Sequence, residues 1–169
     1  RDNMMVIHQE NAGAAAARNR GIEQSDADLI TFLDADDLWD PAKLRIQEDF
    51  MNAHPDIGYV TCQLIEFHSQ ELTDEQRDRT PLRTGNQPAM LPSSAMIRRS
   101  AFDHAGLFDP RWKTGEFLDW CFRADENGIR NSRLQEVLVK RRIHNGNLGR
   151  TAAAKTDYHR IIKASLDRK

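Results

Sequence analysis

Three carboxylates within four positions form the group of residues best suited to chemistry: Asp34, Asp36 and Asp37. They follow residues 29–33, an apolar run with β character, and they precede Asp40-Pro41, a pair typical of a helix start. A buried strand that ends in acids gathers like charges at the edge of a sheet, and a cation is the natural way to hold them. Hard oxygen ligands suit Mg²⁺ or Mn²⁺, which keep open positions for phosphate oxygens. We therefore expect a metal-assisted site for a phosphorylated substrate.

The same acids have other interpretations. Asp also clusters in solvated turns and at helix caps, where its side chain bonds the local backbone. An EF-hand loop is excluded, because the sixth position counted from Asp34 holds Trp39 and not the required Gly. A phosphatase-type nucleophilic Asp stays open on local grounds, although the Thr and Lys that should accompany it are missing nearby. A solvated turn and a metal-dependent phosphate-ester hydrolase therefore remain alternatives.

The composition limits the class of protein. The chain has 169 residues, enough for one domain with its own core, and we expect residues 1–169 to form a single domain. Its 24 basic and 26 acidic side chains leave a formal charge of −2, which gives no support for nucleic acid as a partner. No apolar run approaches the roughly 18 residues of a membrane span. Cys62 and Cys121 stand far apart in apolar surroundings, so we expect free buried thiols and a cytoplasmic location, with the inner face of the membrane as an alternative.

Strand-like and helix-like segments alternate along the first part of the chain, with turn residues at their ends. Asn11 is placed to cap the first helix and Gly21 to end it, while Asp40 and His54 bound the second. The expected strands are residues 4–8, 29–33, 57–67 and 137–143, and the expected helices are 11–21, 40–54, 100–105, 116–127 and 151–169. A long polar loop spans 69–92. This alternation predicts an α/β/α sandwich with a mainly parallel central sheet, whose ligands bind beyond the carboxyl ends of the strands.

Three separated blocks of the sequence resemble glycosyltransferase family 2. The first runs from Gln9-Glu10-Asn11-Ala12-Gly13 through Asp34-Ala35-Asp36-Asp37 to Leu44, and it is the most specific in its spacing. The second runs from Ile97 to Asp109, and the third joins Glu116-Phe117-Leu118-Asp119 to Arg142-Ile143-His144. The resemblance implies the Rossmann-like GT-A fold. It also implies an N-terminal truncation, because the family's first two strand–helix units, with their Pro-x-Tyr-Asn segment, have no counterpart after Arg1.

The resemblance also implies roles for individual residues on the donor side. Asp34 and Asp36 match the family's DxD motif, which holds a divalent metal and, through it, the diphosphate of a nucleotide-sugar, so Mn²⁺ or Mg²⁺ is the expected cofactor. His144 matches a late histidine that completes the metal shell or meets the diphosphate. The positions expected to bind the nucleotide-sugar are Asn11, Gly13, Arg18 and Asp37. The alternative for Arg18 is an ion pair with an acid at the surface.

A second motif carries the expected proton acceptor. The family's Glu-Asp-x-Asp pattern reads Glu116-Phe117-Leu118-Asp119 here, so its second acid is replaced by Phe117. Glu116 and Asp119 are one helical turn apart and can share a face. We expect one of them to take the proton of the acceptor hydroxyl, with Asp119 preferred over Glu116. The alternative is that Asp119 pairs with Arg123 at i+4.

The resemblance therefore implies an inverting, metal-dependent glycosyltransferase. Its donor would be a nucleotide-sugar linked to UDP or GDP, and its acceptor a sugar, a lipid-linked saccharide or a protein. The polar loop 69–92 is expected to select the acceptor. The main alternative is a non-catalytic fragment that acts as a binding module or forms homo-oligomers, which the altered Glu116-Phe117 motif favours.

Overall fold

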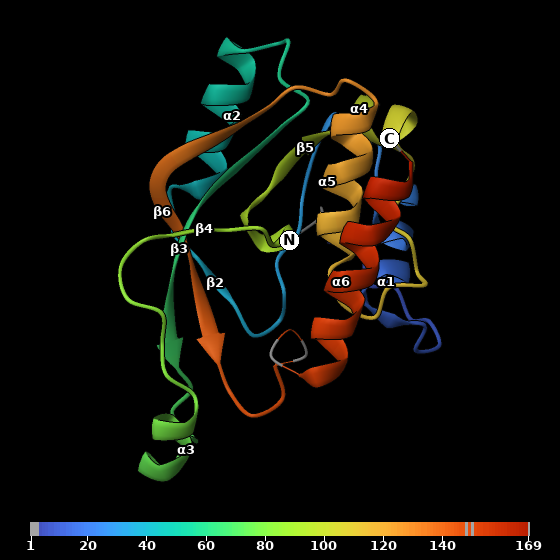
Figure 1. Ribbon diagram of the computed structural model, residues 1–169. Helices are drawn as coiled ribbons and strands as arrows, with labels where there is room; N and C mark the ends of the chain where they lie inside the picture. The colour runs from blue at the N-terminus through green and yellow to red at the C-terminus, as the bar shows by residue number, and fades with distance from the viewer. Residues whose placement is uncertain (1–3, 148, 150, 169) are drawn as a thin grey trace.

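A computed structural model of the chain describes residues 4–147, 149 and 151–168. It is a mixed α/β structure in which helices lie on both faces of one sheet (Figure 1). The helices are α1 (Gly13–Glu23), α2 (Lys43–Ala53), α3 (Asp74–Arg79), η1 (Pro92–Ser94, a 3₁₀ turn), α4 (Arg99–Ala105), α5 (Glu116–Glu126) and α6 (Ala152–Asp167). The strands are β1 (Leu29–Thr31), β2 (Leu38–Trp39), β3 (Tyr59–His68), β4 (Gln87–Pro88), β5 (Met96–Arg98) and β6 (Asn131–Ile143).

The sheet has the order β1-β5-β3-β6-β2, with β4 added to β3. Only β3 and β6 pair in parallel among the described strands, and the other four pairings are antiparallel. The expectation of a mainly parallel sheet is therefore wrong. Two strands that are parallel neighbours need a long crossover connection between them, usually a helix. The segment between β3 and β5 holds only short elements, and β5 enters the sheet antiparallel between β1 and β3.

The pairings nevertheless give β1, β3 and β6 a common direction, because β1 and β3 are both antiparallel to β5. Their carboxyl ends consequently lie at the same edge of the sheet. Asp34 follows β1 at this edge, and His144 follows β6. This is where the residues of the candidate site converge.

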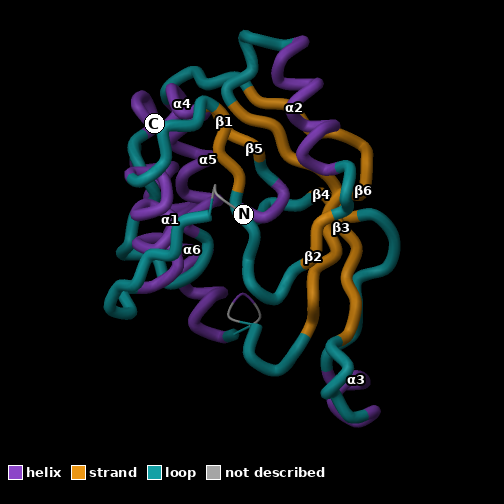
Figure 2. Tube along the Cα trace, turned by 180° about the vertical axis from the view of Figure 1, so that it is seen from behind, coloured by secondary structure: helices purple, strands orange, loops and turns teal. Residues whose placement is uncertain are grey.

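Helices α1, α4, α5 and α6 cover one face of the sheet, and α2 covers the other (Figures 1 and 2). The larger core lies under the first group, where Trp120 is fully buried and packs against Tyr59, Phe102 and Phe117. The indole N–H of Trp120 donates to the Gly106 carbonyl at 2.9 Å. This aromatic core holds α5, and with it Glu116, against the sheet.

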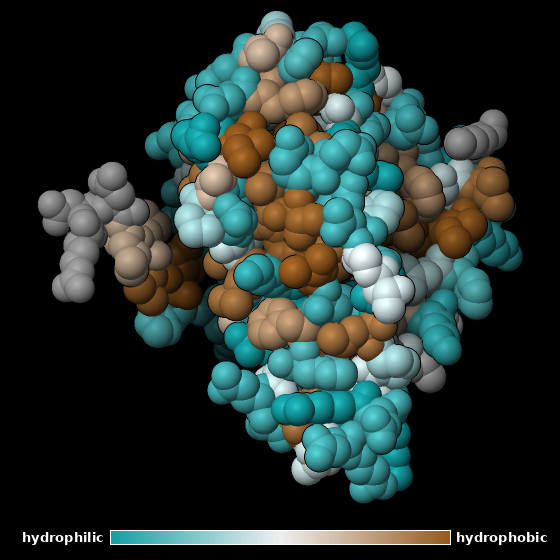
Figure 3. Space-filling view, turned by 90° about the vertical axis from the view of Figure 1, so that its left-hand side faces the viewer, coloured by the Kyte–Doolittle hydropathy of each residue, from teal (hydrophilic) through white to brown (hydrophobic). Residues whose placement is uncertain are grey.

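Two smaller clusters pack α2 onto the opposite face. Met51 lies with Val60 and Met96, while Ile46 packs against the cluster around Leu138 and Val139. Figure 3 shows the side of the molecule that lies at the left in Figure 1, where apolar side chains gather below the α2 end and above the hydrophilic α3 end. Helix α2 therefore covers only part of this side of the molecule.

The first expected strand is absent, since residues 4–12 have no regular secondary structure. Met4, Met5 and Val6 are 78%, 67% and 71% exposed, and no described strand pairs with them. An isolated extended segment has no ladder of hydrogen bonds to stabilise it. The expected end of α1 at Gly21 is also wrong, because the helix continues to Glu23 and buries Ile22.

The other helices and strands begin or end a few residues away from the expected positions. Asp40 Oδ1 accepts the Ala42 amide at 2.8 Å in a turn that precedes α2, and the regular helix begins only at Lys43. Its last residue is Ala53, so the helix stops before His54-Pro55, as expected. The polar loop contains α3, which begins with a capping box between Thr73 and Gln76. Strand β6 begins six residues before the expected Val137, at Asn131.

Other expectations are confirmed. Gly106 and Gly128 follow α4 and α5 with φ of +77° and +70°, values that favour glycine. Cys62 and Cys121 are both free and buried. Among the residues that the structure describes, no helix combines the length and the apolar character that a membrane crossing requires.

Candidate functional site

The three aspartates lie in a tight turn between two strands, which we call the acidic turn (residues 34–37). The Asp37 amide donates to the Asp34 carbonyl at 3.0 Å, and β2 begins directly afterwards. Strand β2 pairs antiparallel with β6, with Leu38 opposite Lys140. The acidic turn is therefore fixed at both ends by the sheet and does not lead straight into a helix.

Ser93 of η1 lies behind the acidic turn and contacts two of its residues, together with Trp39 of β2. Its hydroxyl oxygen accepts the Asp34 amide at 3.3 Å, and its carbonyl accepts the indole N–H of Trp39 at 2.8 Å. A hydrogen bond between the Ser93 side chain and Asp37 helps to keep the Asp37 carboxyl ionised. Ser93 is fully buried, so these bonds form away from water. Sequence reasoning missed Ser93, because nothing local distinguishes it from other loop serines.

Asp37 is fixed to the last strand of the sheet. Its Oδ1 accepts the Arg142 amide at 3.2 Å, and Arg142 Nε donates in turn to the Asp36 carbonyl at 3.0 Å. Burial raises the pKa of Asp37 to about 6, while the Arg142 amide and Ser93 oppose the rise. Asp37 therefore supports the acidic turn from behind, at the wall of the site.

His144 lies against Asp36, with Nε2 at 3.0 Å from Oδ2. The Gly146 amide donates to Nδ1 of the same ring at 3.1 Å. Because Nδ1 accepts a hydrogen bond, the neutral ring carries its proton on Nε2 and donates it to Asp36. The structure thus brings His144 to the acidic turn, as a partner of one of its carboxylates.

Arg18 of α1 joins the acidic turn to α5. Its two terminal nitrogens contact Asp34 Oδ1 and Glu116 Oε1, and the Arg18 side chain is only 12% exposed. Helix α1 is held in place by Asn19, whose amide group exchanges hydrogen bonds with the backbone of Phe108 at 2.8 and 3.0 Å. Arg18 thus pairs with acids, but with two acids of the candidate site and not with the surface acid of the alternative interpretation.

Glu116 stands at the first position of α5, directly after Gly115. Gly115 has φ of +81°, and a Cβ atom there would lie 2.8 Å from the ring of Tyr158, so both backbone and space require glycine. Glu116 is 7% exposed, and burial raises the pKa of its carboxyl while Arg18 opposes the rise. A buried carboxylate with a raised pKa is suited to accept a proton.

The acidic turn, Arg18 and Glu116 surround a cavity of about 290 Å³, which we call the first cavity, whereas Ser93 and His144 support the acidic turn without lining this cavity. Its charged lining consists of Arg18, Asp34, Asp36, Asp37, Lys113, Glu116 and Arg141. Tyr158 of α6, Ala14 of α1 and residues 90–92 complete much of the remaining wall. The acidic turn, α1, α5, β6 and the loop before α5 thus bring four carboxylates and three cations around one space.

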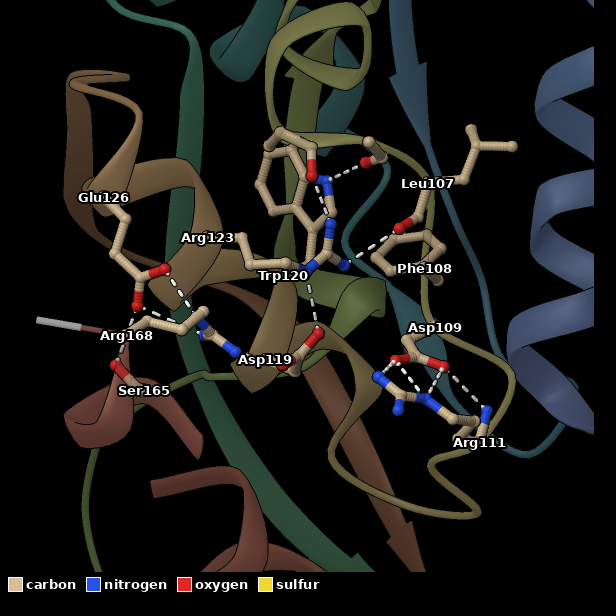
Figure 4. Close-up of polar contacts among 12 residues, drawn as sticks. Leu107, Phe108, Asp109, Arg111, Asp119, Trp120, Arg123, Glu126, Ser165 and Arg168 are labelled. Carbon is tan, nitrogen blue, oxygen red and sulfur yellow. Dashed lines mark hydrogen bonds and ion pairs between the residues drawn. The ribbon is translucent and has the colours of Figure 1, made fainter. Parts of the chain in front are cut away.

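Asp119 lies outside this cavity. Figure 4 shows its carboxylate turned toward Arg123, whose Nε lies 2.9 Å from Oδ2, while Arg168 Nη1 lies 3.8 Å from Oδ1. Arg123 also donates to the Leu107 carbonyl at 2.8 Å. Asp119 is 2% exposed, so this buried pair joins α5 to the segment after α4 and to the end of α6. The geometry supports the i+4 pairing with Arg123 and places Glu116 alone of the two acids at the cavity.

Asn11 and Gly13 lie at the exposed start of α1, beside the cavity residue Ala14. Asn11 Oδ1 accepts the Gly13 amide at 3.1 Å, and Gly13 has φ of +88° with open space around it. Neither residue lines the first cavity. Asn11 therefore forms its hydrogen bond at the start of α1, but the N-cap residue of the helix has no side-chain hydrogen bond.

The acidic turn is the place where the sequence predicted a metal ion. Within residues 4–147, 149 and 151–168, no group of three or more His, Cys, Asp or Glu side chains is arranged to hold a metal ion. Asp34 and Asp36 each have one oxygen engaged, by Arg18 and His144 respectively. Mg²⁺ is commonly bound by one or two carboxylates together with substrate phosphates. The two carboxylates fit a metal of that kind, whose remaining ligands would come from a diphosphate.

Two residues of the cavity wall, Arg141 and Tyr158, carried no signal in the sequence. Tyr158 belongs to a polar helix whose position against α5 depends on long-range packing, and Arg141 stands among three consecutive basic residues of β6. Only the register of β6 against β3 shows which of these basic side chains lie inward.

The fold and the site together define an α/β domain with an acidic cavity at the carboxyl edge of its sheet. Comparison with known proteins places this domain in a family. A family model described as glycosyl transferase family 2 matches residues 2–106, more than half of the chain. The chain belongs to glycosyl transferase family 2, as its sequence blocks predicted.

Individual relatives agree with this membership. An uncharacterised glycosyltransferase of Nostoc sp. is 32% identical over 170 residues, covering 92% of this chain and 52% of the relative. A pre-mycofactocin glycosyltransferase of Mycobacterium tuberculosis is 26% identical over 141 residues, covering 75% of this chain and 29% of the relative. The chain thus spans about half of the first relative and less of the second.

Among solved structures, the fold is similar to that of TarS from S. aureus. The complex of TarS with UDP-GlcNAc gives a TM-score of 0.69 at 14% identity, covering 94% of this chain and 47% of TarS. The complex with UDP gives 0.64 at the same identity, covering 46% of TarS. This likeness confirms the expected α/β fold of the GT-A type.

Proposed function

We propose that this chain forms the diphosphate-facing and acceptor-facing parts of the active site of a metal-dependent glycosyltransferase. The observation that supports it best is the position of Arg18, which joins Asp34 of the acidic turn to Glu116 at the start of α5. The candidate metal ligand and the candidate proton acceptor thereby lie in one cavity. The structurally similar TarS was solved with UDP and with UDP-GlcNAc, which supports a nucleotide-sugar as donor.

On the donor side, Asp34 and Asp36 would hold Mg²⁺ or Mn²⁺, with His144 fixing the carboxylate of Asp36. When bound, the metal would neutralise charge on the diphosphate of a UDP- or GDP-linked sugar. The start of α1, with Asn11 and Gly13, would face the nucleotide part of the donor. Arg18 acts mainly by orienting Asp34 and Glu116, because its guanidinium is already engaged by both.

On the acceptor side, Glu116 would remove the proton of the attacking hydroxyl. A bond then forms between the acceptor oxygen and the anomeric carbon, while the bond from that carbon to the diphosphate oxygen breaks. The electron pair leaves with the nucleoside diphosphate, and the proton stays on Glu116. A single in-line displacement of this kind inverts the anomeric configuration. Asp119, which the sequence favoured for this step, is engaged by Arg123 instead.

Calorimetric titration of the chain with UDP and with GDP, each with and without Mn²⁺, tests this proposal. We expect Mn²⁺-dependent binding of one nucleotide. Asp34→Asn should abolish the Mn²⁺ dependence, whereas Asp49→Asn should not, since Asp49 is an exposed acid of α2 paired with Arg45 at 3.7 Å. Binding of neither nucleotide, or equal binding by the Asp34→Asn variant, would contradict the proposal.

A non-catalytic binding module is the second candidate. It is favoured by Phe117, which replaces an acid of the family motif and is 1% exposed in the aromatic core. With Asp119 also engaged elsewhere, Glu116 is the one acid of this motif that reaches the cavity. Mn²⁺-dependent binding of UDP without release of UDP from any UDP-sugar would identify this second candidate.

A further inference from the structure

A second cavity of about 290 Å³ lies beside the first. Met90, Leu91, Arg141 and Tyr158 line both, so the two spaces share one wall. The second cavity is further bounded by β3 and by the segment around β4, which belongs to the polar segment 69–92. A molecule bound there would lie next to the donor site without occupying it.

The lining of the second cavity suits a saccharide. Its polar groups are the planar side chains of Glu66, Arg83, Gln87 and Arg141, which can bond to pairs of adjacent oxygens. Leu64, Met90 and Leu118 supply apolar surface for the faces of a ring. Cavities that combine apolar walls with a few placed polar groups are typical of small-ligand sites.

The charges of this lining are unequal. Glu66, whose side chain is 1% exposed, lies 3.6 Å from Arg141 Nη1, and its second oxygen accepts the backbone amide of Arg83 at 3.0 Å. Glu66 therefore compensates Arg141. The guanidinium of Arg83 is exposed, and within the described part of the chain no ion pair involves it. Among the described residues of its lining, the second cavity thus has an excess positive charge, which sits on Arg83.

Tyr158 lies where the two cavities meet. Burial raises the pKa of its phenol, Arg141 and Arg83 oppose the rise, and Glu116 adds to it, so all three charges lie near the ring. A ligand of the second cavity would therefore extend past Tyr158 toward Glu116. An acceptor hydroxyl could reach the candidate proton acceptor from this direction.

We propose that the second cavity binds the acceptor, and that the acceptor is a saccharide with an anionic substituent that Arg83 receives. This inference rests on the proposed function. A guanidinium matches the two oxygens of a carboxylate or a phosphate. Arg83 thus selects the acceptor by charge, while the planar groups of Gln87 and Arg141 bond the ring hydroxyls and Glu66 holds Arg141 and the Arg83 backbone in place.

Binding of three matched sugars to the chain tests the proposal by NMR titration. Methyl β-glucuronide and glucose 6-phosphate carry the charge as a carboxylate and as a phosphate, and methyl β-glucoside carries none. We expect at least one anionic sugar to bind about three- to fivefold tighter than the glucoside at low salt, the range of an exposed ion pair. The preference should shrink as salt is added. Equal binding of all three sugars would overturn the proposal.

Variants of Arg83 separate its role from general charge. Arg83→Ala should remove the preference, and Arg83→Glu should reverse it in favour of the glucoside. Both keep the amide that bonds Glu66, so the loop should stay in place. Arg79→Ala is the matched control, because Arg79 is an exposed arginine of α3 that lines neither cavity. Retention of the preference in Arg83→Ala, or its loss in Arg79→Ala, would also overturn the proposal.

UDP binding in the presence of Mn²⁺ is measured on the same samples. If UDP does not bind but the sugar preference depends on Arg83, the proposed donor site fails and the second cavity remains an anionic-saccharide site. If UDP binds and the preference is absent, the donor site stands and this inference fails.

Discussion

The guanidinium of Arg18 and the carboxylate of Glu116 form an ion pair at the cavity wall, although 98 positions separate them in the sequence. The pair connects the first helix with the start of α5. It also orients a buried carboxylate whose pKa is raised by desolvation, since one of its oxygens is held by Arg18. Glu116 is therefore the acid best placed to accept a proton in this cavity.

Replacing Glu116 with Gln should test this role. The amide oxygen of Gln can still accept a hydrogen bond from Arg18, but it cannot take the proton of an acceptor hydroxyl. We expect kcat to fall by about 10²–10⁴-fold, while the Kd for UDP with Mn²⁺ changes little. The rate is followed as release of nucleoside diphosphate from the nucleotide-sugar that binds best. A kcat within threefold of the original chain would exclude Glu116 as the base.

Asp119→Ala should behave in the opposite way. It removes the partner of Arg123 from a place where the acid is 2% exposed, and breaking such a buried pair costs about 3 kcal/mol of unfolding free energy. We expect a lower midpoint in urea and an unchanged Kd for UDP at temperatures where the variant is folded. If the variant instead keeps its stability and loses kcat, Asp119 acts in the reaction and the orientation described here is not the active one.

Local signals predicted many element ends correctly. His54-Pro55 ends α2 and Gly128 follows α5, because a proline or a glycine with positive φ stops a helix whatever lies around it. The cluster of acids at residues 34–37 was also predictable from the residue types alone. The helix ends depend on neighbours in the sequence, whereas the conformation of the acidic turn also depends on Ser93 and Arg142.

Features that depend on distant partners were not predictable in this way. Strand β5 has only three residues, and its antiparallel insertion between β1 and β3 is decided by pairing across the sheet. Residues 4–7 have the composition of a strand but no described partner. Asp119 and Glu116 are one turn apart on a helix, and only the packing of α5 against α4 and α6 decides which of them faces the cavity.

Ser93→Ala tests how the acidic turn is held. Loss of the hydroxyl removes the acceptor of the Asp34 amide and the hydrogen bond to Asp37, while the Ser93 carbonyl still binds Trp39. Each lost buried hydrogen bond is worth about 1 kcal/mol, so we expect binding of UDP with Mn²⁺ to weaken by roughly 5- to 30-fold. The measurement is calorimetric titration at fixed Mn²⁺.

Ser94→Ala provides the control for Ser93. Ser94 is equally buried, but its hydroxyl donates to the carbonyls of Ala89 and Leu91 and not to the acidic turn. It should lower the urea midpoint without weakening nucleotide binding. Equal loss of UDP affinity in both variants would show that η1 acts through general stability and not through Ser93.

Lys43 gives a prediction for stability against pH. Its ammonium is fully buried beside Trp39, at 4.2 Å from the ring centre, and donates to Gln47 at 2.6 Å. Burial lowers the pKa of Lys43 from 10.5 to about 8. Below pH 8 the amine is charged in both states, so the full cost of burying the charge is present. Between pH 8 and 10.5 the folded chain holds fewer protons than the unfolded one, and the free energy of unfolding rises with pH.

Lys43→Met should remove this dependence. We expect the difference in unfolding free energy between Lys43→Met and the original chain to change by about 2 kcal/mol from pH 7 to pH 10, in favour of the original chain. Comparing the two chains cancels the titration of Tyr59, which both retain, and Cys62, whose charge interacts with that of Lys43, is replaced by Ala in both chains. Lys140→Met is the control. Because Lys140 is exposed on β6, its replacement should not change how the free energy of unfolding depends on pH in this range. A difference that stays constant over this range would mean that Lys43 keeps an ordinary pKa and that its burial carries no charge penalty.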